Sequence, residues 1–282
     1  MIIERTYFDP KQTFECGQCF RWHLIDEVYL GVVDGALLAV TPHDKASYRV
    51  TVLAGDLSED RLYDYFDMSV SYADVIGTLA HKDQWLEKAT QQGSGIRLLN
   101  QDPFETLITF IISANNNIPK IKMAVEALSE KFGHYIGTHK GRPYYAFPTV
   151  EALEKAEVVD LQVKGMGYRS KSIYKAVAQI TSGNLDLKTP YDLSFDDAKT
   201  WLMTLYGVGG KVADCVLLFA YGHKNAFPID TWMKKVLLNY YGIDGSQKQV
   251  EAFAKSYFSE YAGYAQQYLF DFIRNENKTG RL

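Results

Sequence analysis

Cysteine is scarce in this chain, and no apolar run approaches the ~18 residues that a membrane-spanning helix needs. The three cysteines cannot all pair in disulfides, and no basic-then-apolar leader opens the sequence. These absences exclude a disulfide-stapled secreted scaffold and predict no membrane helix. We therefore expect a reduced, soluble, intracellular protein.

An excess of positive charge is also lacking. The 282 residues include 30 Lys and Arg against 34 Asp and Glu, which gives a net charge of −4. This balance excludes a basic coat over the whole surface, but it is compatible with a local basic groove. Apolar residues make up 47% and charged residues 23%, the mixture of an ordinary globular protein with a sizeable core.

The first part of the chain carries β-type patterning. Asp34-Gly35 separates the apolar runs 28–33 and 36–40, which predicts a β-hairpin, and 49–53 has the pattern of a further strand. Amphipathic helical patterns follow at 62–66 and 72–79. We assign residues 1–95 to a β-rich domain with flanking helices.

From about residue 96 the apolar period becomes helical. Asp102, Pro103 and Glu105 have the types and spacing of an N-cap, a first helical residue and a capping-box acid. Further helices are predicted at 119–132, 173–180 (stopped by Gly183), 194–207, 212–221, 231–240, 250–261 and 264–274. The predicted fold class is α+β, with an N-terminal antiparallel sheet and an all-helical domain over 96–282.

Three glycines, Gly207, Gly209 and Gly210, lie between two of these helices and predict a helix-hairpin-helix at about 198–221. Glycine permits positive φ and a close approach of the backbone to a ligand. Free N–H groups at the start of the second helix would suit a DNA phosphate. The alternative is a tight joint between helices that binds nothing.

Lys211 and Asp230 are the candidate reactive residues. Lys211 follows the glycines in the first helical turn, where the helix dipole disfavours a cation and so favours the neutral, nucleophilic amine. Asp230, in Phe-Pro-Ile-Asp, precedes a helical run and is an N-cap that could also face a cleft. The alternatives are an exposed lysine that reaches a phosphate or solvent, and a purely structural cap.

Seven motifs in order carry a resemblance to a known family. They are CGQCFRW (16–22), GIRLLNQDPFE (95–105), FIISANNNI (110–118), GMGYRSKSI (165–173), LYGVGGKVADC (205–215), FPID (227–230) and GYAQQYLF (263–270). Together they resemble the 8-oxoguanine DNA glycosylase/lyase family of the helix-hairpin-helix (HhH-GPD) superfamily. The short chain without a basic tail is more similar to prokaryotic members.

The resemblance implies a bifunctional DNA repair enzyme. Lys211 would attack C1′ of a flipped nucleotide, release the base, form a Schiff base and cleave the strand by β-elimination, with Asp230 as its partner. The expected substrate is double-stranded DNA with 8-oxoguanine, preferably opposite cytosine. A monomer is expected, associated with the nucleoid in the cytoplasm, or nuclear if the source is a eukaryote.

The resemblance also implies roles for binding residues. Base binding falls to Gly17, whose carbonyl would accept the N7–H that guanine lacks, and to Cys215, Gln266 and Phe270. DNA binding beside the lesion falls to Asn115, Lys120, Tyr168, Arg169 and the hairpin glycines. Lys120 stands where animal members have an arginine, so we expect looser selection of the opposite base, because lysine lacks the bidentate fork.

Other classes are less consistent with the residues. Cys16 and Cys19 lack the second pair that a zinc site needs. No cysteine follows Cys215, so no iron–sulfur cluster, metal or other cofactor is expected. A monofunctional alkylbase glycosylase on the same fold, or a non-catalytic DNA-binding or damage-sensing module, are the alternatives, and covalent trapping on DNA discriminates them.

Overall fold

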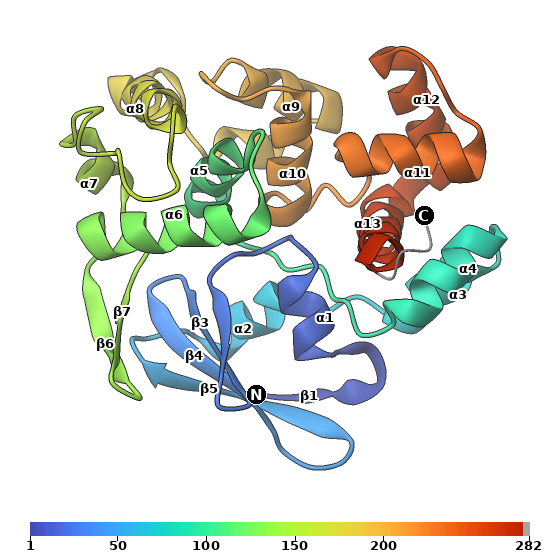
Figure 1. Cartoon of the computed structure of the whole chain (residues 1–282), viewed down its shortest axis with the longest axis horizontal. Coiled ribbons are helices and arrows are strands. Elements are labelled where there is room, and N and C mark those ends of the chain that lie inside the picture. The colour runs from blue at the N-terminus through green and yellow to red at the C-terminus, as the bar shows by residue number, and fades with distance from the viewer. Residues whose placement is uncertain (279–282) are drawn as a thin grey trace.

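A five-stranded antiparallel sheet forms the base of the molecule in the computed structural model, which describes residues 1–278 (Figure 1). The strand order is β1-β5-β4-β3-β2. The strands are β1 (Ile2–Glu4), β2 (Trp22–Ile25), β3 (Val28–Val33), β4 (Ala36–Pro42) and β5 (Ser47–Ala54). Asp34 and Gly35 make the predicted turn between β3 and β4, and both have the positive φ that a two-residue hairpin turn requires.

Two short helices pack on this sheet, α1 (Pro10–Glu15) and α2 (Glu59–Tyr65). Phe14 of α1 stacks on Trp22 of β2 with 4.0 Å between ring centroids, and Leu62 of α2 joins the same core. The sequence patterns did not reveal α1, β1 or β2, which have three to six residues each and lack a clear apolar period.

The remaining elements are helices and one small hairpin. The helices are α3 (Tyr72–Ala80), α4 (Gln84–Gln92), α5 (Pro103–Ser113), α6 (Ile118–Phe132), α7 (Val150–Glu154), α8 (Arg169–Gln179), α9 (Phe195–Met203), α10 (Gly210–Ala220), α11 (Thr231–Tyr241), α12 (Gln247–Phe258) and α13 (Ala262–Lys278). The hairpin is formed by β6 (Tyr135–His139) and β7 (Arg142–Tyr145). Helix α5 is the centre of the helical part, in contact with α6, α8 and α10. The predicted α+β class is confirmed, but the prediction of an all-helical domain over 96–282 is wrong at β6 and β7, which pair as an antiparallel hairpin.

Helices α3 and α4 belong to the first 95 residues, but their apolar faces join the core of the helical part. Figure 1 shows them beside α13, and α4 packs on α13 directly. Tyr268 of α13 donates from its hydroxyl to the carbonyl of Ile96, just after α4. Helix α13 therefore packs against the segment 84–96, far from it in the sequence.

The predicted helix over 194–207 is wrong at its end. Ser194 caps α9 as expected, but α9 stops at Met203. Thr204 then bonds back to Trp201, and Gly207 has φ +85°, outside the helical region. The joint to α10 therefore begins at Thr204, before the first of the three glycines.

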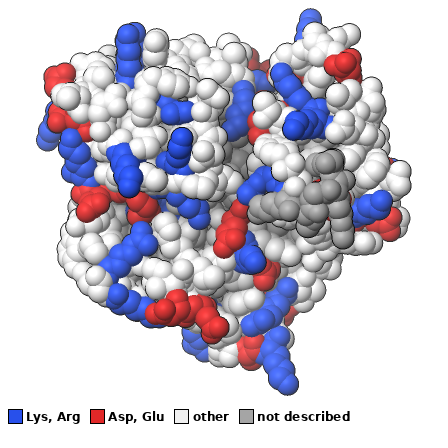
Figure 2. Space-filling view, viewed as in Figure 1, with Lys and Arg blue, Asp and Glu red and all other residues white. Residues whose placement is uncertain are grey.

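No helix in the described part of the chain is long and apolar enough to cross a bilayer. On the face shown in Figure 2, basic and acidic side chains are interspersed, with no coat of one sign. This agrees with the net charge of −4.

Glu105, in the first turn of α5, lines a small polar cavity with Cys19, Arg21, Tyr65 and Asp102, among others. Burial raises the pKa of Glu105 from 4.5 to about 8. The folded protein therefore binds this proton more tightly than the unfolded chain does. The tighter proton binding stabilises the folded protein. This stabilisation is fully present below pH 4.5 and is lost as the pH rises through about 8.

We expect Glu105→Gln to raise the free energy of unfolding by about 1–2 kcal/mol near pH ~9, because the variant keeps a neutral group there. Near pH ~4 the two proteins should be equally stable, since the carboxyl is mostly protonated in both folded and unfolded chains. Urea unfolding at both pH values measures the difference. A gain of the same size at the two values would contradict the prediction.

Candidate active site

The turn between α9 and α10 leaves the first backbone N–H groups of α10 without a capping side chain. A Cβ on Gly207 would lie 2.8 Å from Cβ of Ser172, so the turn packs against α8 only because the residue is glycine. Gly209 is the N-cap of α10, provides no side-chain cap, and has open space where a Cβ would be. The first N–H groups of α10 are thus available to a phosphate, as the glycines predicted.

Lys211 lies in the first turn of α10, as predicted. Its Nζ donates to Oγ of Ser113, at the end of α5, at 3.4 Å. The same nitrogen lies 4.9 Å from the centre of the Phe110 ring. Residues 212–220 of α10 are all buried, so the backbone that carries Lys211 is fixed by the core.

Asp230 is the N-cap of α11, as predicted. Its Oδ1 accepts from the backbone N–H groups of Trp232 at 3.0 Å and Met233 at 2.9 Å. Both capping bonds use one oxygen, so the cap orients the carboxylate and leaves Oδ2 outside the cap. The structural role and the predicted catalytic role are therefore compatible in one residue.

One cavity brings the predicted catalytic and base-binding residues together. It is lined by Lys211 and Asp230 and by the four predicted base-binding residues, Gly17, Cys215, Gln266 and Phe270. The rest of the lining is Phe110, Phe219, Pro228 and Gln267. These residues come from the loop after α1, from α10, from the start of α11 and from α13. The arrangement places an amine and a carboxylate at the edge of an aromatic-walled pocket.

The pocket is closed in this structure. Its volume is about 40 Å³, close to that of one water molecule and far below that of a purine. Phe270 fills the space, because its Cε1 lies 3.2 Å from the point where a Cβ of Gly17 would be. A purine therefore does not fit the pocket as it stands in this structure.

Gln266, which lines this pocket, has a buried side-chain oxygen that accepts no hydrogen bond from the described residues. The side chain is 5% exposed, and its Oε1 finds no hydrogen-bond partner among the described residues. A buried acceptor without a donor costs about 1–3 kcal/mol. A ligand that brings N–H donors into the pocket would recover this energy. Nearby, burial raises the pKa of Cys215 to about 11, so its thiol is neutral and serves as an apolar wall.

Gly17 is held by Gln18, a residue that the sequence analysis did not single out. The fully buried Gln18 side chain donates to the carbonyls of Thr13 and Arg97 and accepts from the N–H of Leu99. Gly17 itself has φ +94°, a conformation that favours glycine. The only available signal was the position of Gln18 within the CGQC motif.

We expect Gly17→Ala to reduce 8-oxoguanine excision by at least about tenfold, because the new methyl group strains φ and pushes against Phe270. Cleavage of a preformed abasic site should change much less, since no base has to be bound. Single-turnover assays on the two substrates measure the ratio. Gly141→Ala is the matched control: it carries the same φ strain in the β6–β7 turn but meets no neighbour. Equal losses for Gly17→Ala on both substrates would contradict the prediction.

Three of the residues predicted to bind DNA beside the lesion, Asn115, Tyr168 and Arg169, lie around the end of α5. Tyr168 is 63% exposed, and its hydroxyl donates to the carbonyl of Ala114. Arg169 is only 7% exposed, and its guanidinium donates to the carbonyls of Ala114 and Asn115. Asn115 has φ +50°, so Arg169 holds a left-handed turn in place. The predicted DNA-binding roles of Asn115, Tyr168 and Arg169 stay predictions.

Lys120 belongs to the same edge of the molecule. It is exposed in the first turn of α6, and its N–H donates to the capping side chain of Asn117. A Cβ on Gly165 would lie 2.7 Å from the carbonyl of Lys120, so the loop that carries Tyr168 packs tightly on this turn. Ser113 and Phe110, which touch Lys211, were missed by the sequence analysis, although both lie in the FIISANNNI motif.

A glycine hairpin, a lysine in the following helical turn and a capping aspartate that lines the same aromatic-walled pocket define a helix-hairpin-helix DNA glycosylase. Residues 1–107 match the family "8-oxoguanine DNA glycosylase, N-terminal domain", and residues 108–260 match the "HhH-GPD superfamily base excision DNA repair protein" family. The chain belongs to the 8-oxoguanine DNA glycosylase family.

Named relatives agree with this assignment. N-glycosylase/DNA lyase OGG1 of Arabidopsis thaliana is 32% identical over 92% of this chain and 75% of its own length. N-glycosylase/DNA lyase of Saccharomyces cerevisiae is 32% identical over 91% of this chain and 74% of its own. The 8-oxoguanine glycosylase/lyase of Clostridium acetobutylicum, bound to double-stranded DNA with cytosine opposite 8-oxoguanine, is 36% identical with a TM-score of 0.90, over 98% of both chains.

Proposed function

We propose that the protein excises 8-oxoguanine from double-stranded DNA and then cleaves the strand, as a bifunctional glycosylase/lyase. The observation that carries the proposal is the shared pocket of Lys211, Asp230 and the unsatisfied Gln266 oxygen. The relatives support it, because they are named N-glycosylase/DNA lyase, and the Clostridium structure holds DNA with 8-oxoguanine.

The proposed chemistry begins with the neutral Lys211 amine. It attacks C1′ of the flipped nucleotide, the glycosidic bond breaks, and the base leaves with the bonding electrons and takes up a proton. The C1′–O4′ bond then breaks, O4′ leaves with the bonding electrons and takes up a proton from water, and a protonated Schiff base forms on Nζ. Loss of a C2′ proton then expels the 3′ phosphate. Asp230 stabilises the positive charge that develops on the sugar, and these steps call for no metal or other cofactor.

Recognition of the lesion follows from the pocket walls. The carbonyl of Gly17 accepts the N7–H that 8-oxoguanine has and guanine lacks, a difference that a fixed acceptor discriminates strongly. Oε1 of Gln266 accepts from the N–H groups on the Watson–Crick edge. Phe270 and Cys215 enclose the two faces of the ring.

Docking of the duplex uses separate groups. The hairpin N–H groups at Gly207, Gly209 and Gly210 bind a phosphate, and Tyr168 fills the emptied stack. We propose that the protein acts as a monomer. Its substrate is chromosomal DNA, so we propose that it works at the nucleoid in the cytoplasm of a prokaryote, or in the nucleus of a eukaryote.

The test is excision from four duplexes that carry 8-oxoguanine opposite each base, beside undamaged and 3-methyladenine duplexes. We expect cleavage of the four lesion duplexes and not of the undamaged one, with affinity falling steeply as salt rises. Removal of 3-methyladenine without removal of 8-oxoguanine would overturn the proposal in favour of a water-using alkylbase glycosylase. Binding of lesion DNA with no base release would favour a non-catalytic reader.

We expect weak selectivity for the base opposite the lesion, because Lys120 has a single ammonium where an arginine has a planar guanidinium that can form two parallel hydrogen bonds. We expect Lys120→Arg to increase the preference for cytosine over adenine by a factor of about 3–10 in the same assay. Lys248→Arg on α12 is the control and should leave the preference unchanged. An identical preference in Lys120→Arg and wild type would remove Lys120 from this role.

A further inference from the structure

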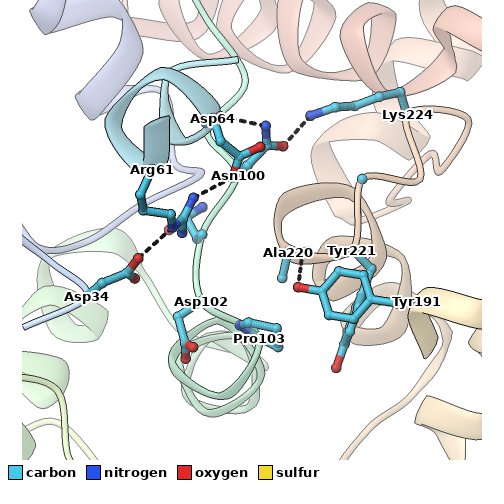
Figure 3. A pocket seen from close by; sticks show the side chains of 12 residues that line it. Asp34, Arg61, Asp64, Asn100, Asp102, Pro103, Tyr191, Ala220, Tyr221 and Lys224 are labelled. Carbon is cyan, nitrogen blue, oxygen red and sulfur yellow. Dashed lines mark hydrogen bonds and ion pairs between the residues drawn. The ribbon is translucent and has the colours of Figure 1, made fainter. Parts of the chain in front are cut away.

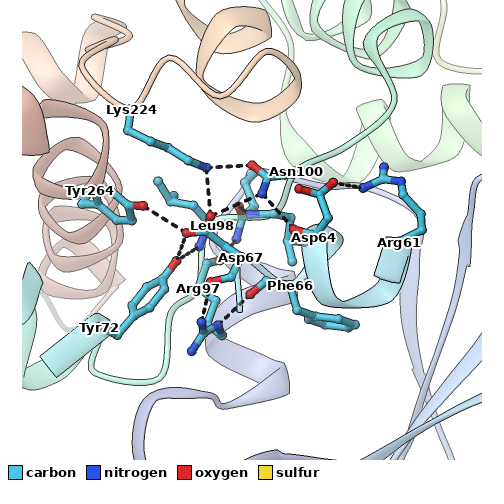
Figure 4. Close-up of polar contacts among 12 residues, drawn as sticks. Arg61, Asp64, Phe66, Asp67, Tyr72, Arg97, Leu98, Asn100, Lys224 and Tyr264 are labelled. Carbon is cyan, nitrogen blue, oxygen red and sulfur yellow. Dashed lines mark hydrogen bonds and ion pairs between the residues drawn. The ribbon is translucent and has the colours of Figure 1, made fainter. Parts of the chain in front are cut away.

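Asp67 is the centre of a buried polar network at the junction of the sheet and the helical part. It is 3% exposed, lies between α2 and α3, and has φ +54°. Its Oδ2 accepts from the hydroxyls of Tyr72 at 2.9 Å and Tyr264 at 3.0 Å. Its Oδ1 faces the Asn100 amide at 3.3 Å and the Lys224 ammonium at 3.6 Å (Figure 4).

Two cations belong to this network: the Arg97 guanidinium donates to the backbone carbonyl of Asp67 at 2.6 Å, and the Lys224 ammonium faces its carboxylate. Lys224 lies in the loop between α10 and α11, and its Nζ also donates to Oδ1 of Asn100 at 2.8 Å. Burial lowers the pKa of Lys224, and the carboxylate of Asp67 opposes that effect. A charge in this position is costly unless it is paired, so the loop is tied to Asp67.

The same loop holds the start of α13. The N–H of Gly263 donates to the carbonyl of Lys224 at 2.8 Å, and a Cβ on Gly263 would lie 2.8 Å from that oxygen. The next residue, Tyr264, reaches Asp67. Gln266 and Phe270 follow on the same helix and line the base pocket.

The network also reaches the opposite wall of the pocket. The hydroxyl of Tyr72 accepts from the N–H of Leu98, and the next N–H, that of Leu99, donates to Oε1 of Gln18. Gln18 in turn fixes Gly17. Both walls that contact the base are therefore connected to Asp67, whereas Lys211 is fixed by the buried face of α10 and Asp230 by its own helix cap.

We propose that Asp67 and Lys224 are positioning residues for base recognition, which set the distance between the Gly17 loop and α13. The proposal rests on the proposed function and concerns the base-binding step alone. Neither residue lines the pocket, so their effect passes through Tyr264 and Gln18. Loss of the pair should misplace Gln266 and Phe270 without moving the reacting amine.

A cleft beside the network permits a conservative rescue. Lys224 lines it with Arg61, Asp64, Asn100 and Tyr191, among others, and its volume is about 430 Å³ (Figure 3). The cleft therefore gives the larger head group of an arginine at position 224 room on the side of Asn100. Lys224→Met keeps the length of the side chain and removes the charge.

The experiment compares single-turnover base excision from an 8-oxoguanine:cytosine duplex with strand cleavage at a preformed abasic site. For Lys224→Met we expect excision to fall by at least about tenfold and abasic-site cleavage to change by less than about twofold. Lys224→Arg should recover most of the excision. Lys140→Met is the control, because it breaks an exposed ion pair with Asp26 far from the pocket and should affect neither rate.

Each outcome decides the proposal. Equal losses on both substrates, or no loss on either, would overturn it. If Lys224→Met does not fold, as circular dichroism would show, Tyr264→Phe takes its place: it removes one hydroxyl, and a selective loss of about threefold is expected. No selective loss in Tyr264→Phe would overturn the proposal. Failure of the wild type to excise 8-oxoguanine would instead refute the proposed function.

Discussion

Lys211→Gln is expected to abolish covalent trapping of the protein on 8-oxoguanine DNA by borohydride and to slow base release by at least about 10³-fold. Borohydride reduces a Schiff base, and glutamine has no amine to form one. Glutamine keeps most of the side-chain length and an N–H donor, although it loses the cation that lies over the Phe110 ring. Binding of the lesion duplex should therefore stay within a few-fold of wild type, because the base pocket and the hairpin are intact.

Lys248→Gln is the matched control for this experiment. Lys248 is an exposed lysine in the first turns of α12, so its loss removes the same charge from the protein without touching the pocket. The control should trap like wild type. A trapped band that persists in Lys211→Gln would assign the nucleophile to another amine, and unchanged base release without trapping would assign it to water.

The reactive pair could be predicted from the sequence because each member obeys a local rule. A glycine hairpin followed by a helical period places Lys211 in the first turn of α10, and Asp230 before the helical run at 231 is an N-cap. The end of α9 could not be predicted in the same way. Its final turn is set by side-chain bonds such as that of Thr204 and by the packing of Gly207 on Ser172, which no pattern along one helix contains.

The base pocket depends on contacts between distant parts of the chain. Gln267 donates to the carbonyl of Cys16 across 251 residues, and Asp67 meets Tyr264 across 197. Only the family resemblance could place Gly17 opposite Phe270, because sequence periodicity carries no information about such pairs. The same limit applies to Arg169, whose buried bonds to the turn at Asn115 were not foreseen.

Asp230→Asn is expected to slow base release by about 10²–10³-fold while leaving the fold unchanged. Asparagine caps helices as well as aspartate does, so Oδ1 can still accept from Trp232 and Met233. What is lost is the negative charge that faces the sugar as positive charge develops. Single-turnover rates and thermal melting of the same samples separate the two effects.

Asp83→Asn distinguishes loss of charge at the site from loss of a charged cap in general. Asp83 caps α4 with the same two-bond geometry, accepting from Trp85 and Leu86, and lies outside the pocket. Its variant should excise 8-oxoguanine like wild type, even if the melting temperature falls through weaker bonds to Tyr241 and Tyr257. Full activity in Asp230→Asn would leave the carboxylate with its capping role alone. Slow base release by Asp230→Asn, together with normal base release by Asp83→Asn, would show that Asp230 has two roles. It caps α11 and stabilises charge during the reaction, because the cap orients its carboxylate.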